Sequence, residues 1–72
     1  MKYRIDASKR NPTEAHVNNV AVSKSTFLRS RATKIAAGFI KQGYWVEVFD
    51  DDSGEQLAGP FDPDERAPSF IL

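Results

Sequence analysis

The chain has 72 residues, with ten Lys plus Arg, ten Asp plus Glu, one His and no cysteine. That length allows one small domain and excludes a multi-domain enzyme, and without cysteine neither disulfides nor a thiolate zinc site can hold the fold together. The formal charge of zero hides a division, because residues 1–41 carry nine bases against two acids and residues 42–72 carry eight acids against one base.

The amino-terminal part of the chain predicts one strand and favours a second. Tyr3, Ile5 and Ala7 alternate with polar residues, and this period of two is typical of a half-buried strand. Residues 9–13 have turn chemistry, and Pro12 stops a simple continuation of that strand. Residues 15–23 fit neither period well, but the β-branched residues within 20–22 favour a short strand.

The middle of the chain gives the clearest helix, over residues 26–41. An apolar stripe at helical spacing is expected to face the sheet, and it is formed by Leu28, Ala32, Ile35 and Phe39.

The ends of this helix also have sequence signals. Ser23 or Ser25 is the expected N-cap, and Lys41 in the last turn complements the helix dipole. Gly43 is expected to end the helix with a positive φ, and Gly38 is interpreted as allowing a close approach to the sheet.

The carboxyl-terminal part predicts a hairpin followed by a tail. Residues 44–49 alternate in a strand pattern, and Asp51–Gly54 supply the turn. Residues 55–59 then return as a partner strand, which Pro60 is expected to stop.

These elements predict an α+β fold of order β-(β)-α-β-β. One helix packs on one face of an antiparallel sheet of three or four strands. We expect a single domain over residues 1–61 and a flexible C-terminal tail over residues 62–72.

No constellation for catalysis or for metal binding is recognisable. His16 is the one imidazole, and neither a nucleophile motif nor a glycine-rich phosphate loop accompanies it. Residues 50–55 superficially suggest a calcium loop, but the sixth and twelfth positions of that register hold Glu55 and Phe61 instead of Gly and Glu. We therefore expect no enzyme activity, no metal and no cofactor.

The surfaces most suited to binding are aromatic or charged. Trp45 and Phe49 lie on the strand face opposite Val46 and Val48, so a helix on the valine face leaves them partly exposed as a protein-binding surface. Alternatively, the tail folds back and places Phe61 or residues 70–72 over them. Phe70-Ile71-Leu72 could instead add to a partner's sheet edge.

Charge offers two further hypotheses. Acids in residues 50–65 can imitate a row of phosphates and occupy a basic groove on another protein, whereas the basic amino-terminal half can bind nucleic acid. The predicted protein-binding residues are Trp45, Phe49, Asp50, Asp51, Asp52, Glu55, Arg29 and Arg31. The alternative nucleic-acid-binding residues are Lys2, Arg4, Lys9, Arg10, Lys24, Arg29, Arg31 and Lys34.

Residues 32–49, together with Asp51–Glu55, resemble the alanine-rich helix, glycine stop and strand–turn–strand of several small anti-CRISPR proteins. Similar small bacteriophage accessory proteins bind host RNA polymerase. The resemblance implies a non-enzymatic, phage-encoded inhibitor that blocks a bacterial nucleic-acid machine by occluding its surface. The alternatives are a small nucleic-acid-binding module and a homodimeric structural or assembly factor.

The chain shows no recognisable secretory signal, and its apolar stretches are far shorter than the roughly 20 residues that span a bilayer. We expect a protein of the bacterial cytoplasm without membrane contact. Its expected partners are a host protein or nucleoprotein complex, and it is expected to be a monomer or a homodimer.

Overall fold

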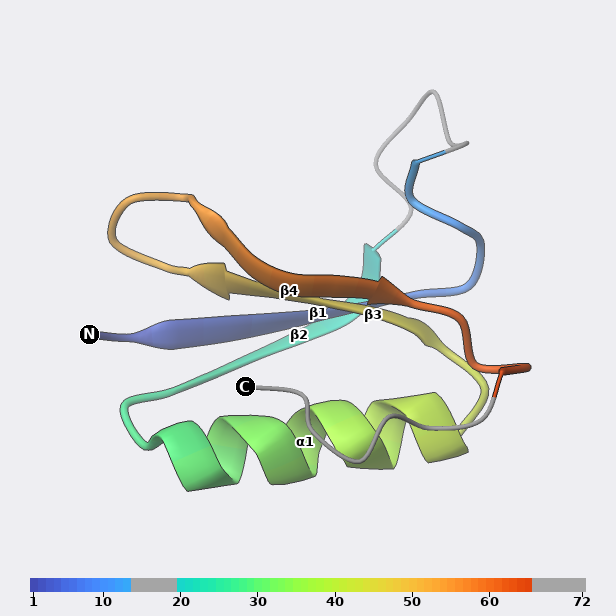
Figure 1. Ribbon diagram of the computed structural model, residues 1–72, viewed down its shortest axis with the longest axis horizontal. Coiled ribbons are helices and arrows are strands. Elements are labelled where there is room, and N and C mark those ends of the chain that lie inside the picture. Colours follow the sequence, from blue (N-terminus) through green and yellow to red (C-terminus); the bar gives the residue numbers. More distant parts are fainter. Residues whose placement is uncertain (14–19, 66–72) are drawn as a thin grey trace.

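The computed structural model describes residues 1–13 and 20–65, which form a four-stranded antiparallel sheet with one helix on one side (Figure 1). In chain order the elements are β1 (Tyr3–Ser8), β2 (Val20–Thr26), α1 (Arg29–Lys41), β3 (Trp45–Asp50) and β4 (Gln56–Phe61). This architecture confirms the predicted α+β fold and its order of elements.

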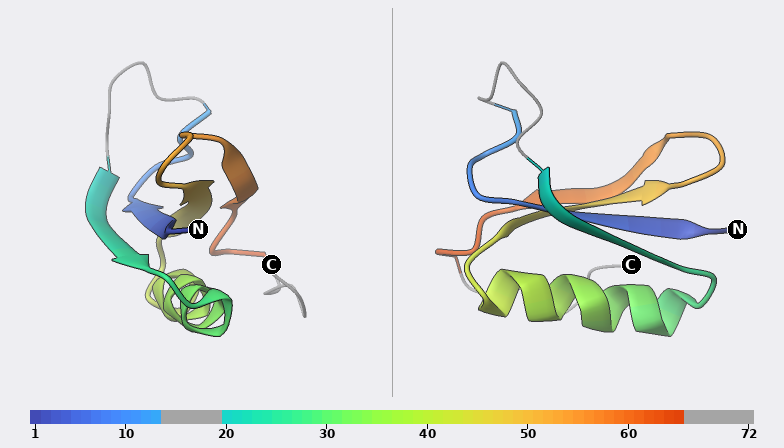
Figure 2. Two further views of the ribbon diagram at one scale, coloured as in Figure 1. Left: turned by 90° about the vertical axis from the view of Figure 1, so that its left-hand side faces the viewer. Right: turned by 180° about the vertical axis from the view of Figure 1, so that it is seen from behind.

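The strand order in the sheet is β2-β1-β3-β4, so β1 and β3 are central and β2 and β4 are the two edges. β1 pairs with both β2 and β3, and α1 connects β2 to β3 on one side of the sheet (Figure 2). The pairing of β1 with β3 places the start of the chain beside the β3–β4 hairpin. For example, Tyr3 lies opposite Asp50.

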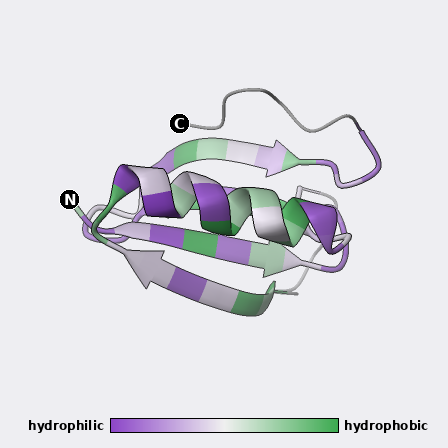
Figure 3. Ribbon diagram, turned by 90° about the horizontal axis from the view of Figure 1, so that it is seen from below, coloured by the Kyte–Doolittle hydropathy of each residue, from purple (hydrophilic) through white to green (hydrophobic). Residues whose placement is uncertain are grey.

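The core lies between the sheet and α1, and it follows from the two sequence periods. Alternate residues of β1 and β3 meet helix residues at helical spacing, and these positions give the apolar bands visible on strands and helix in Figure 3. The buried residues of this core are Ile5, Ala7, Ala32, Ala36, Phe39, Ile40, Val46 and Val48.

The start of the helix differs from the prediction. α1 begins at Arg29 instead of residue 26, because residues 22–26 pair with β1 and extend β2 to Thr26. Ser23 and Ser25 therefore lie in a strand and are not N-caps. Leu28 occupies the N-cap position with extended backbone and no side-chain cap bond, and its side chain is 59% exposed. Leu28 thus does not belong to the buried stripe.

The glycine predictions have mixed outcomes. Gly43 has a φ of 95° after the last turn of α1, which confirms its expected role as the helix-ending residue. The interpretation of Gly38 is wrong, because a Cβ added there would meet nothing within 4 Å. The fully buried Ala32 and Ala36 allow the close helix–sheet contact instead.

β4 is longer than predicted and contains Pro60. The strand runs on to Phe61, and the Gly59–Pro60 peptide bond is cis. Proline is tolerated here because β4 is an edge strand, where one side of the backbone needs no ladder partner. Phe61 lies opposite Val46 and packs against the core, so it does not cover Trp45 and Phe49.

Some predictions fall on residues that the structure does not describe. They include His16, the start of the ambiguous segment 15–23, and the terminal Phe70-Ile71-Leu72. Within residues 1–13 and 20–65, no helix has both the length and the apolar character required to cross a bilayer.

Candidate functional site

The face of the sheet opposite α1 carries the aromatic residues that the sequence singled out. We call this surface the open face and define it by Arg4, Asp6, Trp45, Glu47 and Phe49. Val46 and Val48 are fully buried under α1, whereas Trp45 and Phe49 are only partly buried. This alternation confirms the predicted division of β3 into a core face and a partly exposed face.

Arg4 organises the centre of the open face. Its guanidinium carbon lies 4.8 Å from the centre of the Phe49 ring, in a cation–π contact. Its Nε lies 3.4 Å from Oδ1 of Asp6, and its Nη1 donates to Oδ1 of Asp51 at 3.3 Å. The three contacts hold the aromatic ring and both carboxylates in fixed relative positions.

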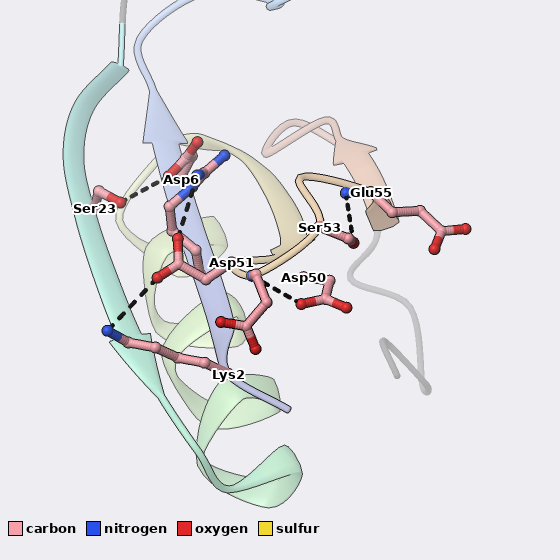
Figure 4. Close-up of polar contacts among 9 residues, drawn as sticks. Lys2, Asp6, Ser23, Asp50, Asp51, Ser53 and Glu55 are labelled. Atoms are coloured by element: carbon pink, nitrogen blue, oxygen red, sulfur yellow. Dashed lines mark hydrogen bonds and ion pairs between the residues drawn. The ribbon is translucent and has the colours of Figure 1, made fainter.

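The β3–β4 hairpin forms an acidic tip, which we define by Asp50, Asp51, Asp52 and Glu55. Its turn is closed by backbone bonds from Asp50 N–H to the Glu55 carbonyl at 2.8 Å and from Gly54 N–H to the Asp50 carbonyl at 2.7 Å. Asp50 Oδ1 also accepts the Asp52 N–H at 3.0 Å, and Ser53 Oγ accepts the Glu55 N–H at 3.2 Å (Figure 4). The tip is thus an internally bonded turn.

The acidic tip is also tied to the start of β1. Asp51 N–H donates to the Lys2 carbonyl at 2.8 Å, and the Lys2 ammonium lies 3.6 Å from Asp51 Oδ2 (Figure 4). Asp51 therefore makes ion pairs with both Lys2 and Arg4. The two oppositely charged parts of the sequence meet at this point.

Two carboxylates face each other across β1 and β3 on the open face. Asp6 is directly opposite Glu47 in the strand register, and Asp6 Oδ1 accepts a 2.7 Å hydrogen bond from Ser23 Oγ. Burial raises the pKa of Glu47 above its usual value, and the negative charge of Asp6 raises it further. A cation brought by a partner would relieve this repulsion.

The open face and the acidic tip together are negatively charged. They contain Arg4, with Lys2 beside Asp51, as bases against the acids Asp6, Glu47, Asp50, Asp51, Asp52 and Glu55. Both bases make ion pairs with acids of the same surface. The surface is therefore complementary to a basic one.

The other predicted basic residues are distributed over different parts of the molecule. Lys24 projects on the helix side, where its ammonium lies 5.8 Å from the Phe39 ring centre. Lys9 and Arg10 are exposed after β1, and the exposed Arg29, Arg31 and Lys34 belong to α1. The structure thus divides the alternative nucleic-acid-binding set between two layers, and it places Arg29 and Arg31 apart from Trp45 and Phe49.

Sequence reasoning missed an exposed apolar pair at the turn between β2 and α1. Phe27 is 73% exposed, and Leu28 beside it projects into solvent as well. The turn is ordered by a 3.2 Å bond from Leu28 N–H to Thr26 Oγ1, and the Lys2 ammonium lies 5.8 Å from the Phe27 ring centre. The available signal was two adjacent apolar residues that precede the regular helical stripe beginning at Ala32.

The part of the chain described here has no group of three or more His, Cys, Asp or Glu side chains placed to hold a metal ion. What the open face offers is contact area and charge. Comparisons of the chain with protein-family models, curated proteins and solved structures give no match. The fold and this surface therefore define the class of the protein: a small α+β domain with an acidic, aromatic sheet face.

Proposed function

We propose that the protein is a non-enzymatic binding protein whose open face and acidic tip dock on a basic surface of a partner protein. The observation that carries this proposal is the position of Asp51 between Lys2 and Arg4. Because these bases are ion-paired within the surface, the remaining acids set its charge. The proposed binding surface is thus acidic, although the amino-terminal part of the sequence, which contributes Lys2 and Arg4 to it, is basic.

The aromatic residues supply the central contact in this proposal. Trp45 and Phe49 are partly exposed, and a partner that covers the remaining area gains a fraction of the roughly 1.5–3 kcal/mol that full burial of a large apolar side chain contributes. Arg4 holds the Phe49 ring in place, so little side-chain entropy is lost on binding. The acidic tip then steers the encounter with a basic partner.

The proposed partner class is a bacterial nucleic-acid machine, such as a CRISPR effector or RNA polymerase. Such machines bind nucleic acid through basic grooves, and an acidic tip can occupy a groove of that kind. The resemblance of residues 32–49 and Asp51–Glu55 to small phage inhibitors supports the same class. In this proposal the protein is phage-encoded and acts in the host cytoplasm by occlusion.

Capture from bacterial lysate with variant baits tests the proposal. The first bait pair is the wild type and the double variant Asp52→Lys/Glu55→Lys, because both side chains are exposed at the acidic tip. The second test variant is Trp45→Ala. We expect both variants to lose the protein that the wild type captures, and we expect wild-type capture to weaken with added salt.

The matched control is Arg31→Glu/Lys34→Glu, a double charge reversal at exposed positions of α1. It should leave capture unchanged. Equal losses with the tip and helix variants would indicate unspecific charge effects, and unchanged capture with the tip variant would overturn the proposal. Salt-dependent binding of the wild type to DNA or RNA, without a protein partner, would favour the nucleic-acid alternative.

A further inference from the structure

The two edges of the sheet are not equivalent. β4 contains Pro60 and has an irregular register with β3, features that disfavour further strand pairing. β2 contains no proline, and Lys24 is its one charged residue. Its residues 22–26 pair one-to-one with Ala7–Tyr3 of β1, and within residues 1–13 and 20–65 no strand pairs with their outer side. The outer side of this regular segment is therefore suited to accept another strand.

Exposed apolar side chains gather along the same edge. Of the large apolar residues that are exposed in the described part of the chain, four lie on β2 or directly after it. Val20 and Val22 are 37% and 38% exposed, and Phe27 and Leu28 are exposed still further. The fifth is Met1, whose neighbour Lys2 lies against Phe27. Such clustering is typical of an association surface.

We propose that β2 pairs antiparallel with β2 of a second copy of this chain. A twofold axis perpendicular to the sheet passes through Ser23, so that Ser23 faces Ser23 of the second copy. The two sheets then form one continuous sheet, and both α1 helices lie on the same side of it. The exposed β2 edges of both copies become internal.

The charge and the geometry of β2 select this register. A twofold axis at Lys24 would set two ammonium groups directly opposite each other, which is unfavourable. An axis nearer the start of β2 would meet the register shift between Ala7 and Ser8, where Ala21 is the extra residue. An axis at Ser23 separates the two Lys24 side chains, because each then faces Val22 of the other copy, and it places Ala21 away from the centre of the ladder, opposite Ser25.

The position of the acidic tip is compatible with a second copy of the chain paired along β2. The tip lies at the Thr26 end of β2, since Tyr3 is opposite both Thr26 and Asp50. Antiparallel pairing therefore sends the two acidic tips to opposite ends of the dimer, where they do not repel each other. The added burial suits a domain of 72 residues, whose own core is small.

Sedimentation equilibrium of the full chain tests the dimer directly. We expect a concentration-dependent monomer–dimer equilibrium for the wild type. Val22→Lys places a second cation opposite Lys24, and twofold symmetry repeats that contact, so dimerisation should weaken at least about tenfold. The matched control Ala37→Lys makes the same charge change on the exposed side of α1 and should leave dimerisation unchanged.

Cysteine cross-linking tests the register, because the natural chain has no cysteine. Directly opposite residues have Cα atoms roughly 4.5–5.5 Å apart, so Ser23→Cys should form an intermolecular disulfide readily. The two copies of Ser25→Cys would be four residues apart along the strands, about 14 Å, and should not cross-link. This pair of variants decides the question even if Val22→Lys fails to fold.

A wild type that stays monomeric at all concentrations would overturn the dimer. The same conclusion follows if Val22→Lys and Ala37→Lys dimerise equally well, or if Ser25→Cys cross-links as readily as Ser23→Cys. The dimer and partner capture are tested separately, because Trp45 and Phe49 lie on β3, two strands away from the β2–β2 contact.

Discussion

Asp51 and Arg4 are 47 positions apart in the sequence, yet Nη1 of Arg4 donates to Oδ1 of Asp51 at 3.3 Å. The contact exists because β1 pairs with β3 and so brings the start of the chain to the hairpin turn. Lys2 lies on the same carboxylate. Asp51 is therefore the acid that ties the tip to β1, whereas Asp52 is exposed.

Asp51→Asn should destabilise the fold modestly. The substitution removes the charge that pairs with both Lys2 and Arg4, and ion pairs at this degree of exposure contribute about 0.2–1 kcal/mol each. We expect a loss of about 1 kcal/mol in the free energy of unfolding, measured by urea denaturation at low salt.

Asp52→Asn is the matched control, because it makes the same chemical change on an exposed neighbour. It should leave the free energy of unfolding nearly unchanged. The difference between the two variants should shrink at high salt, since screening weakens the ion pairs of Asp51. Equal effects of both substitutions would contradict the assigned role of Asp51.

Glu47→Gln should stabilise the protein near neutral pH. Burial, and then the Asp6 charge, raise the pKa of Glu47 in the folded state. A raised carboxyl pKa means that Glu47 contributes stability below its usual pKa of about 4.3, and that this contribution is lost as pH rises through the raised value. Removing the charge should add about 0.5 kcal/mol at neutral pH, on the scale of a like-charge pair across two strands.

The measurement is thermal unfolding of wild type and Glu47→Gln between about pH 3 and pH 7. The two should have similar stability at the acidic end and diverge toward neutral pH, with the variant more stable. Glu55→Gln, at the exposed tip, serves as the control and should follow the wild type more closely. A variant that is less stable than the wild type at neutral pH would contradict the proposed cause of the pKa shift.

The fold was predictable where a segment has a clear period. The alternation in residues 3–8 and 44–49 and the spacing of Ala32, Ile35 and Phe39 correctly assigned two strands, one helix and their shared core. The helix start was not predictable from local signals. Ser25 and Thr26 are good residues for a helix start, but they pair with Arg4 and Tyr3 of β1, a contact that depends on tertiary structure.

In the candidate site, too, local sequence patterns did not predict the contacts that depend on tertiary structure. The alternation within β3 placed Trp45 and Phe49 on the face opposite Val46 and Val48, and their partial exposure depended on the helix covering the valine face. The pairing of Asp51 with Lys2 and Arg4 required the strand order β2-β1-β3-β4, which local patterns do not specify. For this reason the sequence left open whether its basic and acidic parts meet, and the structure shows that they meet at Asp51.

Ala36→Leu should be clearly destabilising. Ala36 is fully buried between α1 and the sheet, and extra methyl groups there must displace either the helix or the core side chains. Overpacking of this kind typically costs about 1–3 kcal/mol. Ala37→Leu makes the same change at the exposed neighbouring position and should be nearly neutral. Thermal unfolding separates the two, because about 1 kcal/mol shifts the Tm of a domain this small by roughly 4–8 °C.

Alanine substitutions at Gly59 and Gly38 should change the free energy of unfolding in opposite directions. A Cβ at Gly59 would lie 2.5 Å from the Val46 carbonyl oxygen and 3.1 Å from Glu47 Cα, on a backbone with φ of +96°. The clash involves the β3 backbone, which cannot move without disturbing the open face, so Gly59→Ala should cost about 1–3 kcal/mol or more.

At Gly38 the added methyl meets nothing within 4 Å, and Gly38→Ala should stabilise α1 by about 0.5–1 kcal/mol. Chemical denaturation of both variants checks the signs, and a destabilising Gly38→Ala would show that this position of α1 is more tightly packed than the structure indicates.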